Sequence, residues 1–392
     1  MTQRYFFTSS AVMWGHPDKL CDRISDALVD AHLAVDPEAR VQAEVAAAGQ
    51  VIFLVTDVSL RGAVDITGIV RRTIAETGYF PRDIDADRCA ILAQSSTLGP
   101  PWTRPAPLQA GAPEEERGAI EQTTVFGYAC SDTKERMPLP ILIAHRLCRY
   151  IEDIANRRAL PGLGPDGEVQ VTVEYVDRKP VRIDTVVIQV QHLGDPQSLR
   201  EALASLAIEP ALQSLQIAID ETTRLIVNPA GPFESAGPAR DAGLTGRKNA
   251  DDTYGGAARH AGHALSGKDP SRLDRSASYA ARHAAANVVA AGLASECELM
   301  LSYSIGESRP ITVSARTFGT GVLPDERLSV IISELFDLRP VAIEKRLRLR
   351  LLPQERGGSF YRKLAVGSHF GRTDLDPPWE QLDMVEPLQR AG

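Results

Sequence analysis

A short segment near the start of the chain combines residue types that bind phosphate and metal ions. It is Gly15-His16-Pro17-Asp18-Lys19, and Pro17 suits the first position of a helix. The N-terminus of a helix attracts anions, and His16 and Lys19 add hydrogen-bond donors. Asp18 is suited to a magnesium ion that bridges phosphates. Taken alone, the segment is equally compatible with a simple capped helix whose charges are solvated.

Two later segments combine glycines with cations in the same way. In Gly243–Lys248, adjacent Arg247 and Lys248 follow two glycines, a combination that suits a polyphosphate. In Ser266–Arg275, Lys268 and Arg272 offer cations, and Asp274 offers a carboxylate for a metal. Each segment alone could be a solvated charged turn. Three such segments in one chain favour a polyphosphate site.

Two other glycine patterns match known nucleotide motifs only superficially. Gly162–Gly167 has the G-x-G-x-x-G spacing, but a predicted helix precedes it and Pro165 interrupts it. Gly262–Lys268 has the G-x-x-x-x-G-K spacing, but Asp269 follows where Ser or Thr would bind magnesium. Neither a dinucleotide-binding fold nor a true P-loop is therefore predicted.

The elements around these segments recur three times in the order helix, strand, strand, helix. The predicted ranges are 17–34, 41–45, 51–55 and 64–76, then 137–158, 169–175, 181–191 and 198–206, then 274–294, 298–305, 311–316 and 326–336. The repeat predicts an α+β fold of three similar domains, each a sheet covered by helices. The alternative is that a common arrangement occurs three times by chance.

The predicted domain boundaries follow this repeat. An N-terminal α+β domain covers 1–103, a central one 118–232, and a C-terminal one 233–380. The stretch 98–117 is dense in Pro, Gly and Ala, which predicts a mobile lid.

Composition excludes several classes of protein. The net charge of the 392-residue chain is -8, so the basic surface typical of nucleic-acid binding is not expected. No run approaches the length of a membrane span, and the first residues contain no long apolar stretch. The five cysteines are scattered without a C-x-x-C pair, which argues against a disulfide framework or a zinc site and favours the cytoplasm.

The three charged segments together resemble the signature segments of S-adenosylmethionine synthetases. The matching sequences are GHPDK at 15–19, GLTGRK at 243–248, DTYGG at 252–256 and SGKDPS at 266–271. Further segments match in the same order, at 118–122, 126–129, 137–140, 144–147, 336–340 and 369–372. The similarity extends from about Phe7 to about Trp379. Several motifs in register are much more specific than any one of them.

The resemblance implies a fold, an assembly and a reaction. The fold is three similar α+β domains related by pseudo-threefold symmetry, which agrees with the repeat above. The assembly is a homodimer or a homotetramer with active sites at the subunit interface. In the reaction, the sulfur of methionine attacks C5′ of ATP and expels the triphosphate, which is then hydrolysed to phosphate and diphosphate. The implied cofactors are Mg²⁺ and K⁺.

The resemblance also implies a role for each matching residue. The catalytic set is His16, Lys268, Arg247 and Lys248. The ATP-binding set adds Asp166, Phe233, Asp241 and Ala264, with Phe233 stacking on adenine. The amino-acid substrate would contact Asp57, Glu121, Asp241, Arg272 and Ile305. Asp18 and Asp274 would bind Mg²⁺, and Glu44 would bind K⁺.

The chain departs from the family pattern mainly around the substrate. Glu168 replaces a phosphate-binding Lys, and the usual lid motif aligns with Leu98–Trp102. The remaining departures are Asp57 for Glu, Glu121 for Asp, Arg272 for Lys, and Ser10 and Trp14 for Glu.

These departures leave three hypotheses. The first is an ordinary methionine enzyme with compensating changes. The second is an adenosyltransferase that uses a different amino-acid nucleophile in specialised metabolism, which Trp14, Trp102 and the altered carboxylates motivate. The third is a catalytically weak paralogue that binds nucleotide and regulates a partner, for which Glu168 is the best support.

Overall fold

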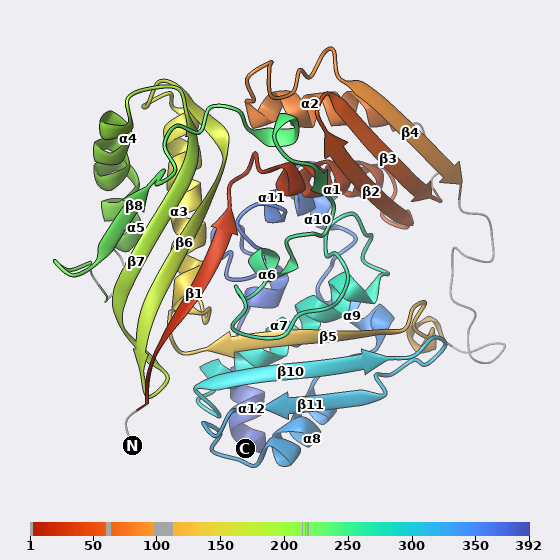
Figure 1. Cartoon of the computed structure of the whole chain (residues 1–392). Coiled ribbons are helices and arrows are strands. Elements are labelled where there is room, and N and C mark those ends of the chain that lie inside the picture. Colours follow the sequence, from red (N-terminus) through yellow and green to blue (C-terminus); the bar gives the residue numbers. More distant parts are fainter. Residues whose placement is uncertain (1–2, 60–63, 98–112, 214, 216, 218) are drawn as a thin grey trace.

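Three β-sheets surround a centre occupied by short helices and connecting segments (Figure 1). This computed structural model describes residues 3–59, 64–97, 113–213, 215, 217 and 219–392. In Figure 1 the sheet of β2, β3 and β4 lies at the upper right, that of β1, β6 and β7 at the left, and that of β5, β10 and β11 at the bottom.

The predicted order of helix, strand, strand, helix occurs three times, and the α+β fold class is confirmed. The first group is α1 (Pro17–Val35), β2 (Val41–Ala48), β3 (Val51–Val58) and α2 (Ile66–Thr77). The second is α3 (Leu139–Asn156), β6 (Leu163–Val176), β7 (Lys179–His192) and α4 (Pro196–Leu203). The third is α7 (Leu273–Ala290), β10 (Glu296–Tyr303), β11 (Thr312–Arg316) and α8 (Asp325–Leu335).

Each of the three hairpins gains an antiparallel neighbour from a distant part of the chain. The short strand β9 (Gly243–Leu244) pairs with β2, β1 (Arg4–Val12) pairs with β6, and β5 (Thr123–Cys130) pairs with β10. Sheet membership therefore crosses the boundaries predicted from the linear sequence. The exchange is cyclic, since each third of the chain supplies a strand to another third.

Two sheets are extended further by parallel strands. β4 (Ala90–Thr97) lies parallel to β3, and β8 (Arg224–Val227) lies parallel to β7. The resulting sheet orders are β4-β3-β2-β9, β1-β6-β7-β8 and β11-β10-β5.

The remaining elements are short and connect or cover the sheets. They are α5 (Glu209–Leu212), α6 (Asn249–Asp252), α9 (Pro340–Arg346), α10 (Leu352–Glu355), α11 (Tyr361–Leu364) and α12 (Val385–Ala391). The 3₁₀ turns are η1 (Glu114–Glu116), η3 (Gly237–Ala239) and η4 (Pro378–Glu380), and a π-helical turn η2 (Ala204–Ile208) continues α4.

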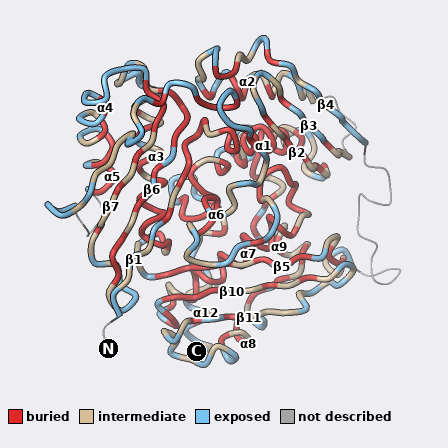
Figure 2. Tube along the Cα trace, viewed as in Figure 1, coloured by how far each residue is buried: buried red, intermediate tan, exposed pale blue. Residues whose placement is uncertain are grey.

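Helix α1 is buried on nearly all sides, as Figure 2 shows. Its apolar residues Leu20, Ile24 and Leu28 share a core with the β2–β3 hairpin, separate from the larger core of the other two sheets. Its polar side is also covered, by segments of the last third of the chain. α1 is thus held in place on both sides.

The structure bears on two further sequence predictions, the lid and the absence of a membrane span. Most of the predicted lid, residues 98–112, lies outside them. In the part that is described, Glu114 and Glu115 pair with Lys345, and Glu116 pairs with Arg339. No helix among the described residues is long and apolar enough to cross a membrane.

Candidate functional site

The N-terminus of α1 gathers four of the predicted site residues. His16 is the N-cap, Pro17 occupies the first turn, and Asp18 lies buried at the start of the helix. Strand β9 brings the loop after it to the same place, because Leu244 donates its N–H to Asp18 at 2.9 Å. Arg247 and Lys248 follow on this loop. The first and second predicted segments therefore meet, although more than 220 residues separate them.

Asp18 neutralises both cations of this cluster. Its Oδ1 lies 2.9 Å from Nε of Arg247, and its Oδ2 lies 2.6 Å from Nζ of Lys248. Burial alone would raise the pKa of Asp18, but the hydrogen bonds from Lys248 and Leu244 outweigh it and hold the pKa below its usual value. A polyphosphate would compete with Asp18 for these two cations.

His16 is held as a neutral hydrogen-bond donor. Its Nδ1 accepts the backbone N–H of Asp18 at 3.1 Å, so the proton of the neutral ring lies on Nε2. Burial lowers the pKa of His16 to about 4, and the Lys248 ammonium acts in the same direction. At neutral pH the imidazole therefore offers a fixed N–H rather than a charge.

Residues predicted to contact the nucleoside flank this cluster. Asp241 is mostly exposed, and its carboxylate lies 3.8 Å from Arg247. Asp166 is buried, and it accepts the N–H of Gly237 at 2.8 Å, which fixes the turn η3. Burial raises the pKa of Asp166 to about 6.

Two more nucleoside contacts were predicted, at Phe233 and Ala264. The ring of Phe233 is covered by Arg240, whose guanidinium lies 4.2 Å from its centre. Adenine can stack on this face only if Arg240 moves. Ala264 lies against Gly246, which has a φ of +77° and no room for a Cβ there. Ala264 therefore supports the loop that presents Arg247 and Lys248.

A second cluster forms where the SGKDPS segment enters α7. Lys268 is buried and lies 2.6 Å from Asp274, which also accepts the hydroxyl of Thr123 at 2.7 Å. Burial would raise the pKa of Asp274, but the Lys268 ammonium outweighs it and holds the pKa low. This cluster repeats the pattern of the first, a buried aspartate paired with a phosphate-binding cation.

Two of the departures from the family pattern contact each other in the second cluster. Glu121 and Arg272 form an ion pair at 2.8 Å, and Glu121 also accepts the N–H of Asp274 at 3.2 Å. Ile305 is exposed beside them, because Ala119 and Ile305 form a bridge. The structure thus brings together three of the predicted amino-acid contacts.

The remaining predicted residues lie on the outer face of the β4-β3-β2-β9 sheet. Asp57 on β3 is directly opposite Gln42 on β2, and Gln42 bridges to Lys268. Glu44 lies two residues further along β2 and is exposed. Asp57 and Glu44 therefore share a face that extends from the second cluster and is uncovered in the single chain.

Four aspartates on one side of α1 were not predicted as a functional set. Asp18, Asp22, Asp26 and Asp30 recur every fourth residue and so lie on one side of the helix. Together they accept backbone N–H groups from three segments of the last third of the chain. The acceptor contacts are Asp18 to Leu244, Asp22 to Gly246 (2.7 Å), Asp26 to Gly267 (2.8 Å), and Asp30 to Phe360, Tyr361 and Arg362.

This stripe of aspartates positions both loops that are predicted to bind phosphate. Asp22 fixes the loop before Arg247, and Asp26 fixes the loop before Lys268. Buried cations balance them, since Lys19 pairs with Asp22 and Asp252, and Arg275 pairs with Asp26. The signal in the sequence that could have identified them is the four-residue spacing of acids on a predicted helix.

Replacing Asp22 by Asn is expected to raise KM for ATP by about tenfold, because weakening its bond to Gly246 loosens the loop that holds Arg247 and Lys248. Asp30→Asn is the matched control. It makes the same change on the same side of α1, but Asp30 holds the start of α11 and not the loop of Arg247 and Lys248. Steady-state kinetics and melting temperatures test this. An equal rise of KM in both variants would show that Asp22 acts only through overall stability.

The carboxylates fit magnesium bound jointly with a substrate. Among the described residues, no group of three or more His, Cys, Asp or Glu side chains could enclose a metal. Mg²⁺ is commonly held by one or two carboxylates together with phosphate oxygens and water. Asp18 and Asp274, each buried beside phosphate-binding cations, provide such single carboxylates. Glu44 offers one exposed oxygen donor for K⁺.

Three other departures from the family pattern have different surroundings. Trp14 is buried in the core, and its indole donates to the carbonyl of Thr77 at 3.0 Å. Glu168 is exposed on β6, opposite Val12 of β1. Leu98 and Trp102 lie outside the described residues. Trp14 therefore does not line a substrate pocket, and it gives no support to a larger nucleophile.

Known proteins and family models match the chain along nearly its whole length. Three domain models of S-adenosylmethionine synthetase match it: N-terminal at residues 4–98, central at 116–233, and C-terminal at 235–381. The chain is 45% identical to the S-adenosylmethionine synthase of Synechococcus elongatus, covering 100% of this chain and 99% of the relative. It is 46% identical to that of Thermosynechococcus vestitus, covering 99% and 98%. Identity to the Trichodesmium erythraeum enzyme is 43%, covering 100% and 98%.

Proposed function

Because the chain belongs to the S-adenosylmethionine synthetase family, we propose that it transfers the adenosyl group of ATP to the sulfur of methionine, releasing phosphate and diphosphate. The observation that carries the proposal is the cluster at the N-terminus of α1. There, a neutral imidazole donor, two cations and a buried carboxylate meet from distant parts of the chain.

The chain's residues would act by holding the reactants and stabilising the departing charge. A thioether has no proton to lose, so the transfer needs no general base. The triphosphate leaves with several negative charges, and Arg247, Lys248 and Lys268 would hold them. His16 would donate its Nε2–H to the oxygen that leaves C5′. Because the imidazole is neutral, it would act as a fixed dipole rather than as a proton donor.

The proposed cofactors are Mg²⁺ and K⁺. Asp18 and Asp274 would hold Mg²⁺ with the phosphates, where the ion supplies further charge neutralisation. Glu44 would contribute to a K⁺ site. Before ATP binds, Arg247, Lys248 and Lys268 neutralise these two aspartates. ATP and Mg²⁺ together would replace these internal ion pairs, with the cations passing to the phosphates and the carboxylates to the metal.

The nucleoside and amino-acid contacts proposed from the family pattern form two groups. Asp166, Phe233 and Asp241 would hold the nucleoside beside the first cluster. Glu121, Arg272, Ile305 and Asp57, with Asp241, would hold methionine, and Ala264 would line the ATP site. The ion pair between Glu121 and Arg272 supports the ordinary methionine reaction, because the two changed residues pair with each other within the chain.

Exchanging this pair for the family's residues is expected to show strong coupling. Glu121→Asp or Arg272→Lys alone would lengthen the ion pair and raise KM for methionine about tenfold. The double variant should lose little more than either single variant, since the first change already breaks the pair. A double-mutant cycle on kcat/KM measures the coupling. Strictly additive losses would contradict a compensating pair.

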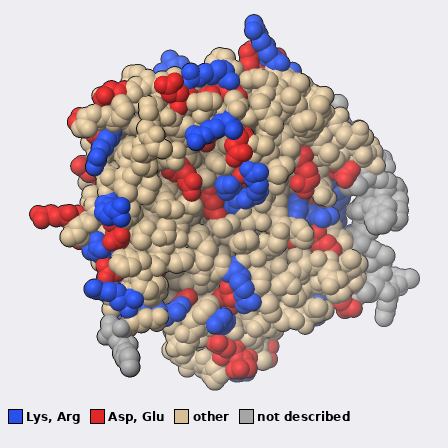
Figure 3. Space-filling model, viewed as in Figure 1, with Lys and Arg blue, Asp and Glu red and all other residues tan. Residues whose placement is uncertain are grey.

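We also propose a homodimer or homotetramer with each active site shared between subunits. The outer face of the β4-β3-β2-β9 sheet exposes Phe53, Val55, Leu92 and Leu244 beside Asp57 and Glu44. Such an apolar sheet face is typical of an interface. Figure 3, viewed from the same side as Figure 1, shows charged side chains of both signs near the middle of that face.

The spacing of the two clusters within one chain supports a shared site. Asp18 and Asp26 are eight residues apart on α1, which places the loops they hold on the order of 12 Å apart along the helix. The cations of each cluster pair with an aspartate of the same cluster, so neither cluster needs the other for charge balance. In the assembly, His16, Asp18, Arg247 and Lys248 of one subunit would face Lys268 and Asp274 of the next.

Three further proposals carry over from the sequence. The domain boundaries are 1–103, 118–232 and 233–380, with exchanged strands between them. A lid at 98–117 remains a prediction, since residues 98–112 lie outside the described residues. The protein is cytoplasmic, with no nucleic-acid or membrane partner, and its five cysteines, all buried and free, support a reducing compartment.

The test is an assay of the purified protein with ATP, Mg²⁺ and K⁺. Methionine and a panel of other sulfur and nitrogen amino acids are supplied in turn, and adenosylated product is followed by mass spectrometry. S-adenosylmethionine from methionine is expected. A product only from another amino acid, or none despite ATP binding, would overturn the proposal.

A further inference from the structure

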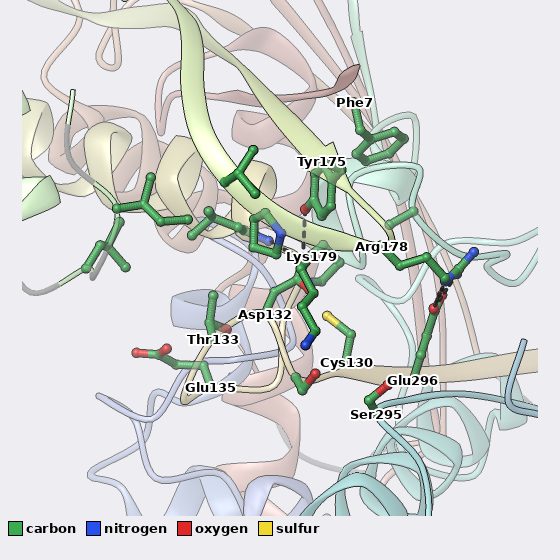
Figure 4. Close-up of a pocket in the computed structure, with 18 of the residues that line it drawn as sticks. Phe7, Cys130, Asp132, Thr133, Glu135, Tyr175, Arg178, Lys179, Ser295 and Glu296 are labelled. Carbon is green, nitrogen blue, oxygen red and sulfur yellow. Dashed lines mark hydrogen bonds and ion pairs between the residues drawn. The ribbon is translucent and has the colours of Figure 1, made fainter. Parts of the chain in front are cut away.

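A cavity lies apart from both clusters. Its volume is about 970 Å³, and it lies where β1, the β6–β7 turn, the loop after β5 and the start of β10 meet (Figure 4). None of the predicted site residues lines it. Its volume is within the range of small-molecule sites.

One wall of the cavity is aromatic. The rings of Tyr5 and Tyr175 stack with their centres 5.2 Å apart, and Phe7 and Tyr128 lie nearby. Such rings favour a flat aromatic or heteroaromatic ligand, and their faces also attract cations.

Two of the carboxylates in the wall already have partners. Asp132 accepts the hydroxyl of Tyr175 at 2.7 Å. Glu296 accepts the hydroxyl of Tyr128 at 2.9 Å, and it pairs with Arg178 at 2.8 Å. In Figure 4, dashed lines mark the contact between Tyr175 and Asp132 and the contact between Arg178 and Glu296. These groups shape the cavity and leave little capacity for a ligand.

Two charged groups in the wall are not satisfied in this way. Glu135 is 6% exposed, and its Oε1 pairs with Arg146, but its Oε2 has no hydrogen-bond partner. Lys179, the first residue of β7, makes no ion pair or hydrogen bond with any residue that the structure describes, and its side chain extends toward Cys130 in Figure 4. A buried carboxylate oxygen without a partner is costly, which indicates a missing cationic or N–H group.

We propose that this cavity is a second ligand site, for a zwitterionic amino acid whose side chain carries an aromatic heterocycle. The carboxylate of Glu135, whose unpartnered oxygen is shielded from solvent in this structure, turns into the cavity to accept the ammonium group. Lys179 binds the carboxylate, and the tyrosine wall stacks on the heterocycle. S-adenosylmethionine has all three features. The choice of S-adenosylmethionine as the ligand rests on the proposed function, in which this molecule is the enzyme's own product. The other parts of the proposal do not rest on that function.

The test counts binding sites by equilibrium dialysis of the full chain with labelled S-adenosylmethionine. The wild type is expected to bind two molecules per chain. Glu135→Gln and Lys179→Met are each expected to weaken one of the two sites about tenfold or more while leaving kcat and KM unchanged. The control is Glu334→Gln, the same change at an exposed position of α8, which should still bind two molecules per chain.

The reciprocal variant separates the two sites. Asp241→Ala, which alters the proposed catalytic site, should keep the site that depends on Glu135. One site per chain in the wild type, or two undiminished sites in both cavity variants, would overturn the proposal. Melting temperatures show whether Glu135→Gln is folded, and Lys179→Met changes only an exposed residue. Failure of the proposed function would appear separately, as absence of turnover.

Discussion

Lys268→Ala is expected to lower kcat by about 10²- to 10³-fold. Lys268 is buried, and in the proposed site it would supply charge where the triphosphate departs. Removing one such donor from an enclosed site has an effect of this size. KM for methionine should change little, because the amino-acid contacts are on other residues. Turnover is measured by mass spectrometry of the adenosylated product.

The matched control is Lys363→Ala, which removes an exposed lysine and should retain full activity. Because Asp274 loses its ion-pair partner in Lys268→Ala, the melting temperature of each variant must be measured as well. A folded Lys268→Ala enzyme with wild-type kcat would remove Lys268 from the catalytic set.

His16→Asn is expected to lower kcat about 10²-fold, since the shorter side chain moves its N–H away from the leaving oxygen. The ratio of the wild-type rate to the His16→Asn rate should be the same from pH 5 to pH 8. The pKa of His16 is lowered to about 4, so the wild-type imidazole stays neutral throughout this range. The pH profile of kcat/KM for both proteins tests this.

The same shift has a consequence for stability. An unfolded chain would protonate His16 near its ordinary pKa of about 6.5, whereas the folded chain does so only near 4. The contribution of His16 to stability is therefore present above pH 6.5 and is lost as the pH falls toward 4. A rate factor for His16→Asn that changes sharply around pH 6.5 would contradict the neutral-donor role.

Sequence periodicity predicted the elements that repeat within one stretch of chain. α1, for example, was predicted over 17–34 and is observed over Pro17–Val35. The strands that place the site were missed, because their partners are distant: Arg4 pairs with Val176, and β9 has only two residues. A strand defined by tertiary pairing leaves little signal in its own sequence.

The motifs identified the site residues, but not how they are neutralised. The segments GHPDK, GLTGRK and SGKDPS named Asp18, Lys248 and Lys268 as candidates. Their pairing depends on which segments α1 contacts, and nothing local specifies this. The contact between Glu121 and Arg272 was hidden for the same reason. The sequence showed two unusual residues 151 positions apart, whereas the structure shows one ion pair.

The most direct test of the account combines two inactive variants in one enzyme. His16→Asn and Lys268→Ala chains, co-expressed with different tags and purified as mixed dimers, are assayed with ATP and methionine. If each site takes His16 from one subunit and Lys268 from the other, one of the two sites is intact. About half of the wild-type rate of S-adenosylmethionine formation per dimer is then expected. Activity no higher than that of either variant alone would contradict a shared adenosyl-transfer site.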